Sequence, residues 1–268
     1  MTDFYDTLLA GAIDGGGGGG SGWTGSDVAT GVYPDNLDVV FYGDKIQYYA
    51  FAGSNIKSFY APNCTNMIQE SDPAGRNASD TCVFCGSDVE TIDMPVFIRT
   101  RDRFALGCKK LTSVKLPIQP FVGGNAFAGC SNLPLFVGQS ATIVYTSAFQ
   151  NCAKLEIVDV LGGDTSSGIN ANAFNGCSIM TVLVLRASTV TKLGNISAFT
   201  NSPFASGKSG GTLYVPSAQI SAYQSASNWS TILGYTNNQI KSIESTHTDP
   251  DAPIDLTLYY ADGTPIGG

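Results

Sequence analysis

The apolar residues of this chain recur in one phrase, apolar-x-x-apolar-x-apolar, which is often followed by proline. The copies are VETIDMP at 89–95, LTSVKLP at 111–117, LPLFVG at 133–138, LEIVDV at 155–160 and MTVLVL at 180–185, with weaker ones at 55–62 and 211–216. Short apolar runs with alternating positions are typical of β-strands. We therefore expect one short strand in each copy.

The copies are evenly spaced in the middle of the chain. Their middle anchors lie 33, 22, 22, 22, 25 and 30 residues apart, at Phe59, Ile92, Val114, Phe136, Val158, Leu183 and Leu213. A unit of this length with one strand falls within the range of leucine-rich repeats, roughly 20–29 residues. A single such strand cannot bury its own apolar face, whereas stacked coils join their strands into a parallel sheet over a continuous core. The pattern predicts a β-rich solenoid of leucine-rich-repeat coils.

A second phrase lies between the strands: AFAGC at 126–130, AFQNC at 148–152, AFNGC at 173–177 and a degraded SAFTNS at 197–202. We expect its Ala-Phe pair to tuck under the next strand and to fill the centre of the coil. Equivalent side chains of stacked coils point in parallel, whereas a disulfide requires two Cβ atoms directed at each other. The spacing therefore predicts a structural ladder of buried free thiols: Cys85, Cys108, Cys130, Cys152 and Cys177.

The N-terminal region differs in composition from the repeats. Residues 1–14 are expected to form a short amphipathic anchoring helix with one apolar face, made of Phe4, Leu8, Leu9 and Ile13. Residues 15–31 contain a run of six glycines and predict a flexible linker.

The C-terminal region also departs from the repeat, as the end of a solenoid must. We assign 32–245 to the solenoid and expect its last part to be a capping helix within 215–235 and a closing strand at 240–245. Ser217 is the expected N-cap of that helix, with Ile220, Tyr223 and Trp229 facing inward. The tail, 246–268, alternates polar and apolar residues around Asp262-Gly263 and predicts a small β-hairpin.

Composition argues against several classes of partner. The net charge is −8, and the 14 basic residues are not clustered, so we expect neither nucleic acid nor an anionic membrane surface as a partner. No stretch approaches the roughly 18 apolar residues of a membrane span. The N-terminus lacks the features of a signal peptide, so we expect synthesis and folding in the cytoplasm of a cell.

Candidate chemistry is sparse. His247 is the only histidine, which argues against most acid–base enzymes. The carboxylates Glu90, Asp93, Glu156 and Asp159 fall on outward strand positions and are expected to be solvated. A single C-x-x-C does not supply the four ligands of a zinc site. A disulfide between Cys64 and Cys82, which flank a polar insertion, remains open beside a plain surface loop. We expect no catalytic residue, metal or cofactor.

One set of outward residues is apolar where solvent would favour polar side chains. Positions three and five of each strand point away from the core. The outward pairs at 91/93 and 113/115 are polar, but the next strands place apolar residues there with the exception of Asp159, and neighbouring coils bring these residues together. Such patches mark interfaces. The sequence predicts partner binding through Leu135, Val137, Ile157, Asp159, Val182 and Val184; coverage by an insertion or by the C-terminal tail remains the alternative.

The unit AF-x-G/N-C-x-x-L-x-x-V-x-L(P) resembles the BspA-type leucine-rich repeat, also called the Treponema pallidum type. CKKLTSVKLP (108–117), AFAGCSNL (126–133) and AFQNCAKL (148–155) carry the resemblance, which covers roughly 45–245. It implies a parallel-strand solenoid that is adhesive or protein-binding and has no catalytic residues. Three positions depart from the pattern. Ser54 replaces a cysteine, Phe104 lies one position further from its cysteine, Cys108, than in the other copies, and Gly138 replaces the last apolar anchor of its strand.

The N-terminal helix, the glycine run and the missing signal peptide resemble structural proteins of tailed phages that infect gut bacteria. Together, these features predict a non-enzymatic binding or adhesion module in a virion, in the tail or a fibre. Its expected partners are a protein or glycan on a host cell surface and, through helix 1–14, other virion proteins, with homo-oligomers also possible. A purely structural virion protein and a bacterial surface adhesin are the alternatives, and a carbohydrate-active enzyme carries the least weight.

Overall fold

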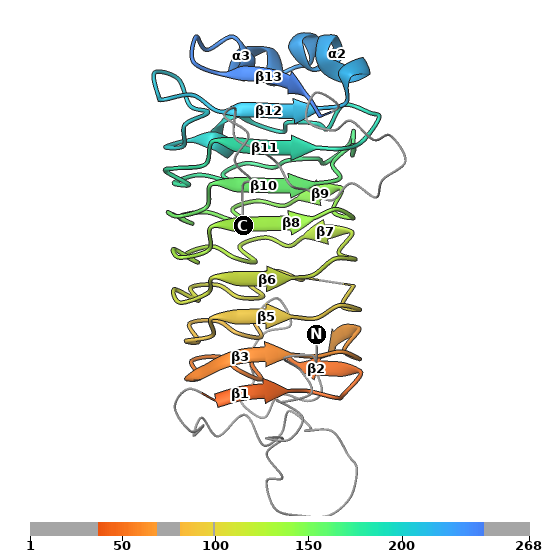
Figure 1. The fold of residues 1–268 in the computed structure, drawn as a ribbon, viewed down its shortest axis with the longest axis vertical. Helices are drawn as coiled ribbons and strands as arrows, with labels where there is room; N and C mark the ends of the chain where they lie inside the picture. The colour runs from red at the N-terminus through yellow and green to blue at the C-terminus, as the bar shows by residue number, and fades with distance from the viewer. Residues whose placement is uncertain (1–36, 69–80, 99, 244–268) are drawn as a thin grey trace, which may run out of the picture.

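A computed structural model describes residues 37–68, 81–98 and 100–243, and these residues form a stack of coils with one short strand per coil on the same side (Figure 1). All strand pairings are parallel. The predicted anchors are direct neighbours in the sheets: Ile92 pairs with Phe59 and Val114, and Val158 pairs with Phe136 and Leu183. The predicted leucine-rich-repeat solenoid is therefore confirmed.

Two sheets make up the strand side of the stack. The first has the order β1-β3-β5-β6 and the second β13-β12-β11-β10-β8. Their bounds are β1 Leu37–Val40, β3 Ile56–Tyr60, β5 Thr91–Asp93, β6 Ser113–Lys115, β8 Leu135–Gly138, β10 Ile157–Val160, β11 Val182–Leu185, β12 Thr212–Val215 and β13 Gln239–Ser242.

The sheet divides between β6 and β8 because of Pro134. In most of the other coils, the residue before the strand donates its backbone N–H to the coil below: Thr112 to the carbonyl of Glu90 at 2.8 Å, and Glu156 to that of Pro134 at 2.9 Å. Pro134 occupies the same position and has no N–H. The ladder is therefore interrupted at this coil, while the return side stays paired.

That return side carries shorter ladders. Strand β2 (Lys45–Gln47) pairs with β4 (Asn66–Ile68), and β7 (Phe121–Val122) pairs with β9 (Ile143–Val144). Single bridges continue the second ladder from Val144 to Ile169 and from Ile169 to Leu193. The β7–β9 pairing joins the two coils on either side of the break at Pro134.

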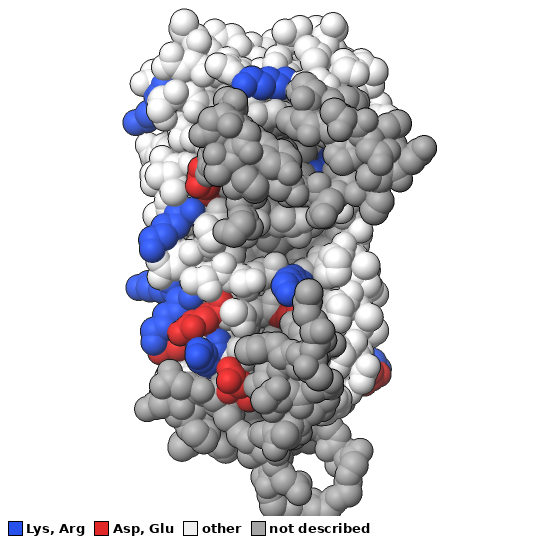
Figure 2. All heavy atoms as spheres, viewed as in Figure 1, with Lys and Arg blue, Asp and Glu red and all other residues white. Residues whose placement is uncertain are grey.

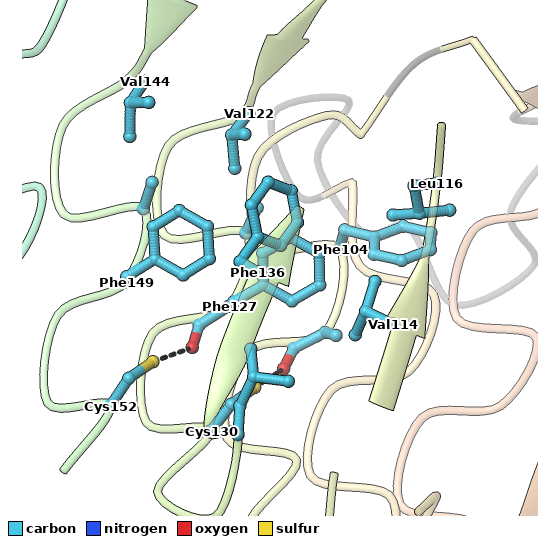
Figure 3. Packing of buried hydrophobic residues seen from close by; sticks show 14 of the residues in the cluster. Phe104, Val114, Leu116, Val122, Phe127, Cys130, Phe136, Val144, Phe149 and Cys152 are labelled. Atoms are coloured by element: carbon cyan, nitrogen blue, oxygen red, sulfur yellow. Dashed lines mark hydrogen bonds between the residues drawn. The ribbon is translucent and has the colours of Figure 1, made fainter. Parts of the chain in front are cut away.

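A column of phenylalanine rings fills the coil centres (Figure 3). Phe127, Phe149 and Phe174 stack with ring centroids 5.5 and 5.7 Å apart and interplanar angles of 12° and 9°. Phe199 continues the column at 5.5 Å. In the coil where the phenylalanine lies one place early, Ala105 takes the usual position, and Phe104 still contacts Phe127 edge-on at 6.0 Å. The Ala-Phe pair fills the coil, as expected.

The residue before each rung of the thiol ladder has a left-handed backbone. Gly107, Gly129, Asn151 and Gly176 all have positive φ, between 61° and 81°. Only glycine and, less readily, asparagine adopt this conformation at low cost. The alternation of Gly and Asn in AFAGC, AFQNC and AFNGC is therefore a backbone requirement of the turn.

Four cysteines form the predicted ladder. Cys108, Cys130, Cys152 and Cys177 are free and fully buried. Each thiol donates to a backbone carbonyl of the preceding coil, at 2.8 Å for Cys108, 3.1 Å for Cys130 and Cys177, and 3.0 Å for Cys152. Figure 3 shows the bonds of Cys130 and Cys152. Burial raises the pKa of Cys177 to about 12 and holds those of Cys130 and Cys152 well above the ordinary thiol value.

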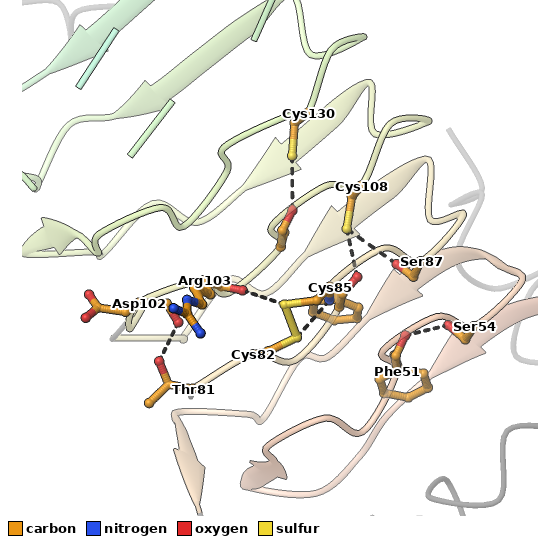
Figure 4. The surroundings of a disulfide bond; sticks show 12 residues. Phe51, Ser54, Thr81, Cys82, Cys85, Ser87, Asp102, Arg103, Cys108 and Cys130 are labelled. Carbon is orange, nitrogen blue, oxygen red and sulfur yellow. Dashed lines mark hydrogen bonds between the residues drawn. A yellow bond between two sulfur atoms is a disulfide. The ribbon is translucent and has the colours of Figure 1, made fainter. Parts of the chain in front are cut away.

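Cys85 was predicted as the first rung, and this is wrong. It is bonded to Cys82, with Cα atoms 5.7 Å apart, and Ser87 stands at the rung with Oγ 3.5 Å from the sulfur of Cys108 (Figure 4). Phe84 holds the phenylalanine position of this coil, so the rung follows three residues later and lies 21 residues before Cys108. The alternative Cys64–Cys82 disulfide is also wrong, since Cys64 is free and buried.

Gly138 replaces a strand anchor because Phe136 occupies the space. A Cβ atom at position 138 would lie 2.7 Å from Cε1 of the Phe136 ring. The larger ring of Phe136 thus fills the volume that two smaller anchors fill in the neighbouring coils.

The C-terminal cap is more divided than expected. Instead of one helix, residues 217–233 form a 3-10 turn, η3 (Ser217–Gln219), and the helices α2 (Ile220–Ser225) and α3 (Trp229–Leu233). Ser217 is not the N-cap, because η3 already begins at that residue, after Pro216. Tyr223 and Trp229 are fully buried, and both bond to Thr191. A further 3-10 turn, η2 (Ile196–Phe199), lies in the coil before β12.

Three predicted segments lie outside the described residues: the helix 1–14 with Phe4, Leu8, Leu9 and Ile13, the linker 15–31, and the hairpin in 246–268. They remain predictions.

Candidate binding face

The second sheet brings the six predicted binding residues into two adjacent rows. Its register aligns Leu135 with Ile157 and Val182 in one row, and Val137 with Asp159 and Val184 in the other. Ile157, Val182 and Val184 form a hydrophobic cluster separate from the core, with Leu135, Tyr214 and Ile243 packed against it. We refer to Ile157, Val182 and Val184 as the outer cluster.

Exposure differs along this face. Thr91 and Lys115 of the first sheet are exposed, and Leu135 and Val137 are half-buried. In contrast, Ile157 is 4% exposed, Val182 8%, and Val184 0%. Although all these positions point away from the core, solvent reaches only those of the first sheet and of β8.

Asp159 is buried in an ion pair, so the expectation that it is solvated is wrong. Its carboxylate accepts two hydrogen bonds from Arg186, from Nε at 2.7 Å and from Nη2 at 2.9 Å. Burial raises the pKa of Asp159 above its ordinary value, and the guanidinium partly opposes that shift. Arg186 directly follows β11, one coil above Asp159. The sequence signal for this ion pair was an acidic and a basic residue at nearby outward positions of neighbouring coils.

A cavity of about 790 Å³ opens on the same face where the sheet divides. Three predicted binding residues, Leu135, Val137 and Ile157, line it. We call this cavity the β6–β8 groove. Its remaining lining is Asp93, Pro95, Thr112, Ser113, Val114, Lys115, Leu116, Pro117, Pro134, Gln139 and Glu156.

Charged side chains border the groove but do not form a stripe of one sign. Lys115 lies 3.8 Å from Asp93, and Lys110 lies 2.9 Å from Asp88. Figure 2 shows acidic and basic residues gathered together along one edge of this face. Neutral and apolar residues make up most of the groove lining, and Asp93, Lys115 and Glu156 add charges of both signs.

The described residues offer little for catalysis or metal binding. Within the ranges that the structure describes, no group of three or more His, Cys, Asp or Glu side chains could hold a metal ion. His247 lies outside those ranges. In the same part of the chain, no helix is long and apolar enough to cross a membrane.

Comparison with known proteins agrees with the repeat architecture. The family model for the BspA type leucine rich repeat region matches residues 44–156 and 80–205, with six copies. No curated protein matches the chain. Repeats of this family suggest a protein-binding or adhesion module, and such solenoids are typically non-enzymatic scaffolds. Since the two matches together span more than half of the sequence, the chain belongs to the BspA-type leucine-rich repeat family.

Proposed function

We propose that this protein is a non-enzymatic adhesion module that binds a protein partner in the β6–β8 groove. The single observation that carries the proposal is the groove itself, since it opens an aliphatic and proline-lined cavity of about 790 Å³ on an otherwise regular sheet. Ligand-binding cavities have volumes of roughly 300–1,000 Å³ and mostly apolar walls.

The lining of the groove favours apolar side chains of a protein partner. Leu135, Val137 and three prolines supply rigid apolar surface, which loses little conformational entropy on binding. Lys115, Asp93 and Glu156 also line it, and protein interfaces combine an apolar centre with polar residues. A partner with one or two large apolar side chains and flanking polar groups fits this arrangement.

Pro134 gives the groove a structural cause. Interrupting the ladder between β6 and β8 separates the strands on the outer side, while the return-side ladder of β7 and β9 holds the coils together. The groove is thus built into a rigid scaffold, which is the arrangement that binding sites require.

We place this module in a virion of a tailed phage, tethered through residues 1–31 and contacting a host surface protein, with a glycan, another virion protein or a second copy as alternative partners. The glycine run and the apolar spacing of 1–14 support a tethered module. Several tethered copies would gain avidity without a strong single contact. A bacterial surface adhesin is the alternative setting, and tail or baseplate genes beside the coding sequence would decide between the two.

The binding proposal is tested with Leu135→Asp/Val137→Asp in the full chain. Binding to host cells or to purified virion proteins should fall by at least about tenfold, because two charges enter an apolar contact. Ile179→Asp is the matched control, since Ile179 is 46% exposed and does not line the groove. Equal loss in both variants, or no loss in the double variant, would refute the groove as the binding site.

A further inference from the structure

The outer face of the second sheet is buried, although no second layer of secondary structure is described over it. At the equivalent positions of the first sheet, Thr91 is exposed and Ser58 and Ser113 are half-buried, whereas Ile157 and Val182 are buried. Leu135, Tyr214 and Ile243 pack against the outer cluster from the sides. These neighbours lie in or beside the same sheet, so they do not form a layer above it.

The ion pair in this face also needs a further neighbour. The Arg186 side chain is 7% exposed, and that of Asp159 1%. Nη1 of Arg186 is buried, and no described residue accepts a hydrogen bond from it. A buried guanidinium donor without an acceptor is costly, so an oxygen atom is expected beside it.

The direction of the chain after β13 identifies the cover. β13 is the edge strand of this sheet, and Ile243, the first residue after it, packs against the outer cluster. Residues 244–268 follow at once. Since strands lie about 4.8 Å apart, β8 is only about 19 Å from β13, well within the reach of this segment.

The other ends of the described chain lie elsewhere. Residues 1–36 join the stack at β1, at its opposite end (Figure 1), and residues 69–80 follow β4 in the first half of the chain. The C-terminal segment therefore starts nearest to the outer cluster, directly after Ile243, which packs against that cluster.

We propose that residues 244–268 dock across the outer face of β10, β11 and β12 and seal the outer cluster and the Asp159–Arg186 pair. The segment DLTLYY (255–260) carries apolar residues at alternate positions, Leu256, Leu258 and Tyr260, which share one face when the chain is extended. That face meets the outer cluster, and a backbone carbonyl or a carboxylate of the segment accepts from Nη1 of Arg186. The β6–β8 groove then remains the open part of the binding face.

The test measures access of solvent to one position in each sheet of the full chain. Val182→Cys and Thr91→Cys replace outward residues at equivalent strand positions, one in each sheet, and the native free thiols are buried. We expect a water-soluble alkylating reagent to label Val182→Cys at least about tenfold more slowly than Thr91→Cys, because labelling requires the cover to open. Equal rates would overturn the proposal.

A second pair of variants assigns the cover to the segment. Adding Leu256→Asp and Leu258→Asp to Val182→Cys should raise its labelling rate to within about threefold of Thr91→Cys, since two charges cannot remain against the outer cluster. If the labelling rate of Val182→Cys stays slow in this variant, the cover is not residues 244–268. If labelling of Val182→Cys becomes slower as the protein concentration rises, the cover is a second copy of the chain, and the assignment is again overturned. Partner binding is not measured, so failure here is separate from failure of the groove variants.

Discussion

The phenylalanine column makes a quantitative prediction, and Phe149→Ala tests it. Phe149 is fully buried and stacks between Phe127 and Phe174, at 5.5 and 5.7 Å, while the Phe136 ring lies 4.8 Å away. Truncating a core phenylalanine costs about 3–5 kcal/mol. We expect about 4 kcal/mol of lost unfolding free energy, because three ring contacts disappear and the coils above and below cannot close the gap.

Urea unfolding followed by circular dichroism measures this loss, with Phe149→Leu as the matched control. Leucine keeps most of the apolar volume but loses the ring stacking, so its loss should be about 1–2 kcal/mol. The slope of free energy against urea should stay constant, which shows that the coils still unfold together.

Two results would refute this explanation. A loss below about 1.5 kcal/mol for Phe149→Ala would mean that the column is not continuous at this coil. An equal loss for Phe149→Leu and Phe149→Ala would mean that ring stacking, rather than filled volume, dominates the column.

Three further predictions follow from the thiols, the ion pair and the sheet break. Because the pKa of Cys177 is about 12 in the folded state, the unfolded chain loses the thiol proton at lower pH than the folded chain does. The free energy of unfolding should therefore fall by about 1.4 kcal/mol per pH unit from about pH 9 to 12 for this thiol alone. The difference in urea midpoint between the wild type and Cys177→Ala should be smaller at pH 10.5 than at pH 8, and a constant difference would contradict the raised pKa. Asp159→Asn should cost about 3–5 kcal/mol in the same assay, since Arg186 stays buried without its counter-charge, whereas a loss below about 1 kcal/mol would show that the pair is solvated. Pro134→Ala supplies the missing N–H, so hydrogen exchange should find a protected amide at position 134 and partner affinity should fall as the groove narrows; an unprotected amide would mean that another feature divides the sheet.

The repeat itself was predictable because each coil imposes the same local demand. An inward strand position must be apolar, and the turn before each rung must adopt positive φ, which selects Gly129, Asn151 and Gly176. These demands recur at the period of the coil and are therefore visible as a pattern. Cys108, Cys130, Cys152 and Cys177 follow the same rule and were placed correctly.

Prediction failed where the period changes. Cys85 continues the cysteine spacing to within one residue, but the coil that contains it is shorter by one residue, so Ser87 stands over the rung instead. Equivalent positions of neighbouring coils are defined by the hydrogen bonds from backbone N–H groups of one coil to carbonyls of the next. The bond from the N–H of Phe84 to the carbonyl of Phe104 aligns this coil with the others. Spacing in the sequence cannot distinguish these two positions, which are two residues apart.

The sequence by itself determined the coil period, the inward anchors and the outward rows of the binding face, because all three depend on alternation and spacing along the chain. Tertiary structure alone decided how those rows are used. The missing N–H of Pro134 leads to a groove only because two coils stack at this position. Asp159 is a buried ion only because Arg186, 27 residues later, bonds to it from the coil above. Both depend on contacts across the stack, which no local pattern encodes.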